Sequence, residues 1–226
     1  ESYGDFRDYL EKSETKSLGR ALAALGFGTQ FTQDYSFGAD QNRVVDGPVD
    51  PVAAGGAALR RSQLAINLAD YPSAIRYAEQ AVQVAQPSGD RLRQAAGQRL
   101  WGRGLREQGQ YDAARSHLEM ARDLAQEEHA DVVWAMSLYE LCALDYFTGN
   151  YAGAQSSWQT VLDFYRQKDD RRGQGLVLRG LGLLANKTGE HSAARAFAEE
   201  ALRLSREVGD RPEEARCLIT TANTAR

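Results

Sequence analysis

The sequence of 226 residues is 42% hydrophobic and 26% charged, as in an ordinary folded protein, so its composition argues against a wholly disordered chain. Its formal charge of −4 argues against the basic excess typical of nucleic-acid-binding proteins. The two cysteines are too few for a disulfide framework, and no apolar run reaches the ~18 residues that a membrane span needs. We therefore expect a cytoplasmic protein with neither a membrane nor a nucleic-acid partner.

Residues 1–50 form the first predicted segment, an N-terminal helical cap followed by a long loop. Apolar residues between Asp5 and Leu25 have loosely helical spacing, which predicts one or two helices. From Gly26 to Asp50 the chain is rich in Gly, Asp and Gln, with aromatic residues interleaved. Two interpretations stay open, because long loops are often functional. This stretch is either a plain loop or an aromatic arm that docks in a groove or on a neighbouring domain.

From residue 51 onward the sequence repeats with a period of 40 residues. The clearest marker is a ring-bearing residue three positions before an alanine, which recurs at Tyr71, Tyr111, Tyr151 and His191. The period divides the chain into four units and a partial fifth, at 51–90, 91–130, 131–170, 171–210 and 211–226. Because a repeat in register predicts a stack of similar units, we expect residues 51–226 to form one array.

Each unit is predicted to hold two helices. In unit 91–130 the first helix runs from about Arg91 to Glu107, and the second runs from about Asp112 to Glu127. Glycine recurs between the two helices of successive units, at Gly109, Gly149 and Gly189. A helix end often needs positive φ, which glycine adopts most easily. The prolines divide into two predicted helix-start residues, Pro72 and Pro212, and three loop residues, Pro48, Pro51 and Pro87.

Small residues recur at two positions of the unit. One column lies on the predicted first helices and consists of Ser62, Gly102, Cys142 and Gly182. The other lies on the predicted second helices and consists of Ala74, Ala114, Ala154 and Ala194. Two helices cross closely only where side chains are small, so we expect these columns to mark the crossing within each pair. Since one unit cannot bury its apolar face alone, the prediction is an all-α solenoid.

The repeat resembles the tetratricopeptide repeat (TPR) family. The resemblance rests on Trp101-Gly102, Gly109-Gln110-Tyr111, Ala114, Leu118 and Ala121, and on the equivalent residues of unit 171–210. The 40-residue unit is longer than the common unit of about 34. It is similar to the long-repeat branch found in bacterial signalling ATPases, in transcription regulators with a helical sensor array, and in eukaryotic spindle-orientation adaptors. The resemblance implies a right-handed superhelix of antiparallel helix pairs that serves as a binding scaffold.

Catalytic chemistry is not indicated by the residues. The three histidines, His117, His129 and His191, lack the i, i+4 spacing of a helical metal site. Cys142 falls in the small column, which predicts a buried, inert thiol, whereas we expect Cys217 to be partly exposed. We therefore predict no enzyme activity, no cofactor and no metal.

A concave groove is the predicted binding surface, because the first helix of each unit lines the concave side of a TPR stack. On that pattern the predicted groove residues are Gln63, Arg99, Arg103, Arg106, Tyr139, Tyr146, Phe147, Arg179, Asn186 and Lys187. The three arginines of unit 91–130 are spaced by four and three residues, so they share one helical face. Two interpretations stay open. Either Glu107 or Asp145 balances the positive charge of the arginines, or the arginines form a cationic wall that binds an acidic peptide or a ligand with a phosphate or carboxylate group.

The leading functional hypothesis is a non-catalytic scaffold that binds an acidic protein or peptide, in its most specific form the sensor or regulatory array of a larger signalling protein. Two alternatives stay open. One is a receptor domain in which a small molecule closes the superhelix around Tyr139 and Tyr146. The other is a self-assembly module whose last unit stacks on a second copy. The chain begins without Met and ends at Arg226 inside a predicted helix, so we also expect a piece of a longer protein.

Overall fold

The computed structural model describes residues 51–224, which form α-helices joined by short turns. The bounds of these helices are α2 Pro51–Asn67, α3 Tyr71–Ala85, α4 Arg91–Glu107, α5 Tyr111–Glu127, α6 Asp131–Thr148, α7 Tyr151–Gln167, α8 Arg171–Thr188, α9 His191–Glu207 and α10 Arg211–Thr224. The cap and long loop expected in residues 1–50 lie outside the described residues. Within the described range the prediction of an all-α fold is confirmed.

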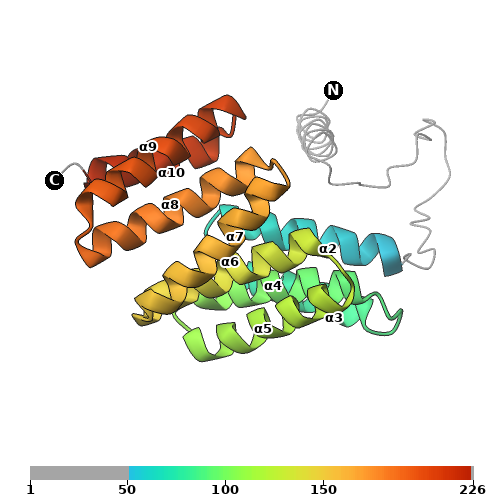
Figure 1. Ribbon diagram of the computed structural model, residues 1–226. Coiled ribbons are helices and arrows are strands. Elements are labelled where there is room, and N and C mark those ends of the chain that lie inside the picture. The colour runs from blue at the N-terminus through green and yellow to red at the C-terminus, as the bar shows by residue number, and fades with distance from the viewer. Residues whose placement is uncertain (1–50, 225–226) are drawn as a thin grey trace, which may run out of the picture.

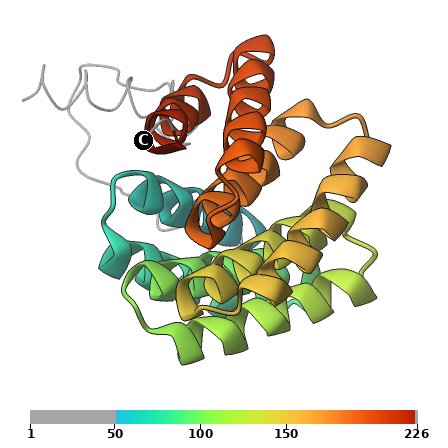
Figure 2. The same ribbon diagram turned by 60° about the vertical axis from the view of Figure 1, so that its left-hand side comes forward.

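Successive helices run antiparallel and pack in pairs (Figure 1). The first helices of neighbouring pairs, α2, α4, α6, α8 and α10, also contact one another in chain order. Between residues 51 and 224, no contact joins any two of the second helices, α3, α5, α7 and α9. The stack therefore curves with the first helices on its inner side, and the curvature is visible in Figure 2. We call the surface formed by the first helices the inner face.

The 40-residue period reappears in the helix boundaries, since first helices begin 40 residues apart and second helices do the same. The glycines expected between the helices of a pair have positive φ, of 76° at Gly109, 86° at Gly149 and 84° at Gly189. Pro72 lies in the first turn of α3, as predicted. Pro51 was expected in a loop, and that prediction is wrong because Pro51 is the first residue of α2. The position suits proline, since the first N–H of a helix has no partner within the helix.

The two columns of small residues meet where the helices of each pair cross. All four alanines of the second-helix column are fully buried. In the first pair the Ser62 hydroxyl donates a hydrogen bond of 2.8 Å to the Ala74 carbonyl. In the second pair, a Cβ on Gly102 would lie 3.0 Å from the Ala114 carbonyl oxygen and 2.6 Å from Cγ of Leu118. The predicted crossing is confirmed in both pairs, and its closeness requires a small residue.

Between α7 and α8, glycines face aromatic rings instead. A Cβ on Gly180 would lie 2.9 Å from Cε2 of Trp158, and a Cβ on Gly173 would overlap the ring of Tyr165. Both rings are buried, with 2% and 3% of their surface exposed. The aromatic side chains of α7 therefore pack directly on the backbone of α8.

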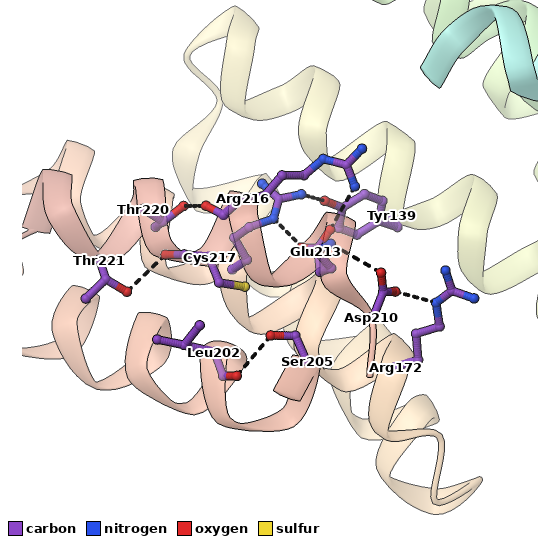
Figure 3. Close-up of polar contacts among 11 residues, drawn as sticks. Tyr139, Arg172, Leu202, Ser205, Asp210, Glu213, Arg216, Cys217, Thr220 and Thr221 are labelled. Carbon is purple, nitrogen blue, oxygen red and sulfur yellow. Dashed lines mark hydrogen bonds and ion pairs between the residues drawn. The ribbon is translucent and has the colours of Figure 1, made fainter. Parts of the chain in front are cut away.

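Both cysteines are free thiols and are fully buried. For Cys142 this is the predicted result. The expected partial exposure of Cys217 is wrong, because its side chain points toward α9 (Figure 3). The residue belongs to an apolar cluster that includes Leu204. Burial raises the pKa of the Cys217 thiol to about 11 and also raises that of Cys142.

The crossing constraint predicts the effect of a single methyl group. Gly102→Ala should lower the free energy of unfolding by about 1–3 kcal/mol, because the new Cβ would overlap Leu118 and press on a backbone carbonyl. Urea unfolding followed by circular dichroism measures the change.

The matched control is Gly56→Ala in α2, where the nearest atom to an added Cβ is Nη1 of Arg60 at 3.6 Å. That variant should be neutral or more stable by up to about 1 kcal/mol, because alanine favours a helix more than glycine does. Equal destabilisation by both substitutions would contradict the crossing constraint.

Candidate functional site

The inner face carries a pocket of about 310 Å³ where α4, α6, α8 and α10 meet, and Trp158 of α7 also lines it. Six predicted groove residues line this inner pocket: Arg103, Arg106, Tyr139, Tyr146, Phe147 and Arg179. They belong to three different helices. The repeat therefore brings them together by stacking first helices side by side.

Four predicted groove residues lie outside the inner pocket. Within α2, Nε2 of Gln63 donates a hydrogen bond of 3.2 Å to Oδ1 of Asn67. Asn186 and Lys187 lie in the last turn of α8. Arg99 is only 7% exposed, so it does not form part of an open wall. A binding role for these four residues stays a prediction.

Sequence reasoning missed several lining residues, among them Glu140, Trp158 and Arg216. Trp158 occupies a core column of the second helices, and its burial at 2% exposure gives no sequence signal of a pocket. Arg216 lies in the partial fifth unit, 40 residues after Leu176 and 80 after Met136, which also line the pocket. Every lining residue except Trp158 shares its position in the repeat with another lining residue. That periodicity is the signal that could have found Arg216.

Glu140 of α6 is the main partner of the arginines on α4. Its side chain is 3% exposed, its Oε2 lies 2.9 Å from Nη2 of Arg106, and its Oε1 lies 3.5 Å from Nε of Arg103. Glu107 adds a second carboxylate, with Oε1 2.9 Å from Nη2 of Arg106. Glu107 therefore helps to balance the charge of these arginines, as one interpretation expected. The main balancing carboxylate, however, is Glu140 of the next unit.

Asp145 does not join this cluster, and the expectation that it compensates the arginines is wrong. It accepts a bond of 2.6 Å from Nη2 of Arg115 on α5. Asp145 lies five residues after Glu140, which is about 140° around the helix, so the two carboxylates project from different faces of α6.

The arginines determine the charge state of Glu140. Burial alone would favour the protonated form, yet Arg103, Arg106 and Arg99 outweigh burial and hold the pKa of this carboxyl below its usual value. Burial lowers the pKa of the Arg99 guanidinium, against the opposing effect of Glu140. Two Arg99 nitrogens, Nε and Nη1, have no hydrogen-bond partner. The cluster thus contains more buried positive charge than buried negative charge.

A second polar cluster joins α6, α8 and α10 (Figure 3). Arg179 of α8 donates from Nε to Glu213 at 2.5 Å and from Nη2 to the Tyr139 hydroxyl at 3.3 Å. Glu213 also accepts a bond of 3.0 Å from Nη1 of Arg216. Tyr139 and Arg179 occupy the same position in consecutive units, 40 residues apart. This contact is therefore a direct product of the repeat.

Aromatic side chains of α6 form an apolar part of the lining. The Phe147 ring is 51% exposed, and its centre lies 5.4 Å from that of Tyr146 and 5.4 Å from Cζ of Arg106. The Tyr146 ring lies 6.3 Å from that of Trp158. The inner pocket thus places an exposed ring beside guanidinium groups, an arrangement that favours ligands with both charged and apolar parts.

Residues 51–224 include no helix with the length and apolar content needed to cross a membrane. In the same part of the chain, no three His, Cys, Asp or Glu side chains gather as a potential metal site. The inner pocket offers guanidinium, carboxylate and phenol groups, which bind ligands through ion pairs and hydrogen bonds.

Two stretches of the sequence match known families. Residues 134–207 match the tetratricopeptide repeat family, and residues 8–94 match the family of anaphase-promoting complex subunit 5. Each match covers less than half of the chain. No curated protein matches the sequence significantly.

Solved structures share the fold at low sequence identity. Aspartyl phosphate phosphatase F from Bacillus subtilis matches 76% of this chain with a TM-score of 0.65 and 15% identity, and the chain spans only 45% of that protein. BtubC (BKLC) from P. vanneervenii matches 78% of this chain over 82% of its own length, with a TM-score of 0.58 and 16% identity. At these identities the likeness shows the fold alone. The chain has a TPR-like repeat fold, as its sequence predicted.

The arginine cluster yields a stability prediction. Glu140→Gln should lower the free energy of unfolding by about 3–5 kcal/mol, because it leaves buried guanidinium groups without their carboxylate. Urea unfolding at pH 7 measures the loss. The difference in unfolding free energy between the variant and the wild type should shrink as the pH falls below 4.5, the ordinary pKa of a glutamate carboxyl. A carboxyl whose pKa is lowered by folding stabilises the folded state only while it is ionised, and at low pH Glu140 becomes protonated.

Glu199→Gln is the matched control, because Glu199 pairs with Arg195 on the surface of α9, with the two side chains 54% and 70% exposed. Its loss should cost less than about 1 kcal/mol. A similar cost for both variants would show that the buried cluster has no special energetic role.

Proposed function

We propose that this TPR-like array is a non-catalytic scaffold whose inner pocket binds an acidic protein or peptide segment. The observation that carries the proposal is the gathering of Arg103, Arg106, Arg179 and Arg216 around one pocket. Guanidinium groups offer paired donors that match the oxygens of carboxylates and phosphates.

The local charge supports an anionic partner. Among the lining residues, four arginines stand against two glutamates, Glu107 and Glu140. The pocket therefore has an excess of two positive charges in a chain whose net charge is −4. Such a concentrated positive region attracts an acidic segment to this point of the surface.

The accessibility of the pocket supports a binding role. Arg103 and Arg216 keep 23% and 48% of their side chains exposed, and Phe147 is 51% exposed. A partner can thus contact cations and an aromatic ring without opening the helix stack. This combination favours a segment in which acidic and apolar residues alternate or adjoin.

The comparisons support a protein partner. TPR domains generally act as protein-binding scaffolds, and residues 8–94 resemble a subunit of a complex that contains several proteins. We further propose that the array is the sensor or regulatory part of a larger signalling protein in the cytoplasm. The two free, buried cysteines are compatible with that reducing compartment.

The proposal is tested by selecting peptides from a phage-displayed random library and measuring the best binder by fluorescence anisotropy. Selected sequences should be enriched in Asp and Glu relative to the unselected library. Arg103→Glu should weaken the best peptide at least ~10-fold, about 1.4 kcal/mol, because it replaces a pocket cation with an anion.

Arg195→Glu on α9 makes the same charge change at an exposed position outside the pocket and should leave the affinity unchanged. Circular dichroism verifies that both variants fold. Selection of peptides without acidic enrichment, or equal weakening by both variants, would refute the proposed site.

A further inference from the structure

The inner pocket has the size of a small-molecule site, and its lining has a cationic part and an apolar part. Its volume of about 310 Å³ lies at the lower end of the range of such sites, ~300–1,000 Å³. One part of the lining is cationic, as described above, and another part is apolar. The apolar part consists of Met136, Ala143, Leu176 and Leu183 together with the rings of Tyr146 and Phe147. A ligand that uses both parts carries a negative charge and an apolar body.

Three buried donors in this lining have no hydrogen-bond partner. Two belong to buried residues, Nε1 of Trp158, which is 2% exposed, and Nε of Arg106, which is 8% exposed. The third is Nε of Arg103, which lies 3.5 Å from Oε1 of Glu140 in an ion pair. Buried N–H groups are nearly always paired, because an unpaired one costs about 1–3 kcal/mol. An acceptor supplied by a ligand would remove this cost, and an anionic oxygen is the strongest such acceptor.

Gly180 lets the Trp158 ring pack against α8 at the pocket. A Cβ at position 180 would lie 2.9 Å from Cε2, the ring carbon bonded to Nε1, so a side chain there would collide with the indole ring. Gly180 itself lines the pocket. Trp158 and the cationic side chains therefore border the same space.

We propose that the inner pocket binds a small organic anion in which a carboxylate or phosphate is attached to an aromatic ring or a branched apolar group. The acidic head pairs with Arg103 and Arg179 and supplies an acceptor for the unpartnered donors. The body packs against Leu183 and the Tyr146 ring. The inference rests on the proposed function, since it uses the same arginines, and adds that a free ligand of this class competes with the acidic segment.

The indole N–H resonances test the inference directly. The chain has three tryptophans, so heteronuclear NMR gives three indole signals, and Trp158→Phe identifies the one from Trp158. Phenyl phosphate and phenylacetate are the probes, at constant ionic strength. Each should shift the Trp158 signal in a saturable way and leave those of Trp101 and Trp134 in place, because neither of these lines the pocket. Inorganic phosphate should bind at least ~10-fold more weakly, and phenethylamine should not bind.

A variant that fills the pocket distinguishes binding in the pocket from non-specific electrostatic attraction of the anion to the protein. Leu183→Trp enlarges a lining residue without changing any charge, and it should weaken phenyl phosphate at least ~10-fold by calorimetry. Leu218→Trp makes the same change at a 45% exposed position of α10 outside the pocket and should have no effect.

The result that overturns the inference is a Trp158 signal that does not move, or equal binding of inorganic phosphate and phenyl phosphate. Equal affinities in the two leucine variants would also overturn it. If the selected acidic peptide still binds and depends on Arg103, the proposed function stands while the small-ligand inference fails. If neither peptide nor aryl anion binds, both fail.

Discussion

The two helices of a pair cross so closely that the array can form only if small residues occupy the crossing. A backbone carbonyl of the second helix lies so near the first helix that the Ala114 oxygen would be 3.0 Å from a Cβ on Gly102. Only small residues satisfy this distance, and they recur every 40 residues. A Cβ on Gly182 would likewise lie 3.3 Å from the Ala194 carbonyl oxygen, and these pairs present their first helices to the same side. Together these first helices form the inner face.

The candidate site follows from that arrangement. Equivalent positions of successive first helices lie side by side, so residues 40 apart in sequence contact one another, as Tyr139 and Arg179 do. A single unit supplies only part of the site. Glu140 from one unit and Arg106 from the unit before it form a buried ion pair at 2.9 Å, and Arg179 reaches Glu213 in the partial fifth unit. The charge of the pocket is thus a property of the stack and of no single repeat.

Much of the fold could be predicted because its determinants are local and periodic. The positive φ at Gly109 and the burial of Ala114 each depend on the helix ends and the crossing within one pair, which the sequence repeats four times. The site was predictable only in part. The arginines of α4 were identified, but whether Glu140 or Asp145 reaches them depends on the rotation of α6 relative to α4. The burial of Cys217 by α9 could have been predicted from the period, because the equivalent residues Gly97, Ser137 and Val177 of the preceding units are also buried.

An acidic partner bound to the inner face should protect the helices that form it, which hydrogen–deuterium exchange with and without a bound acidic peptide measures. We expect slower exchange in α4, α6 and α8, the helices that carry Arg103, Tyr139 and Arg179. The second helices α5 and α9 should change little, because they supply no residue to the pocket. Protection confined to α5 and α9, with α4, α6 and α8 unchanged, would show that the acidic peptide does not bind the inner face.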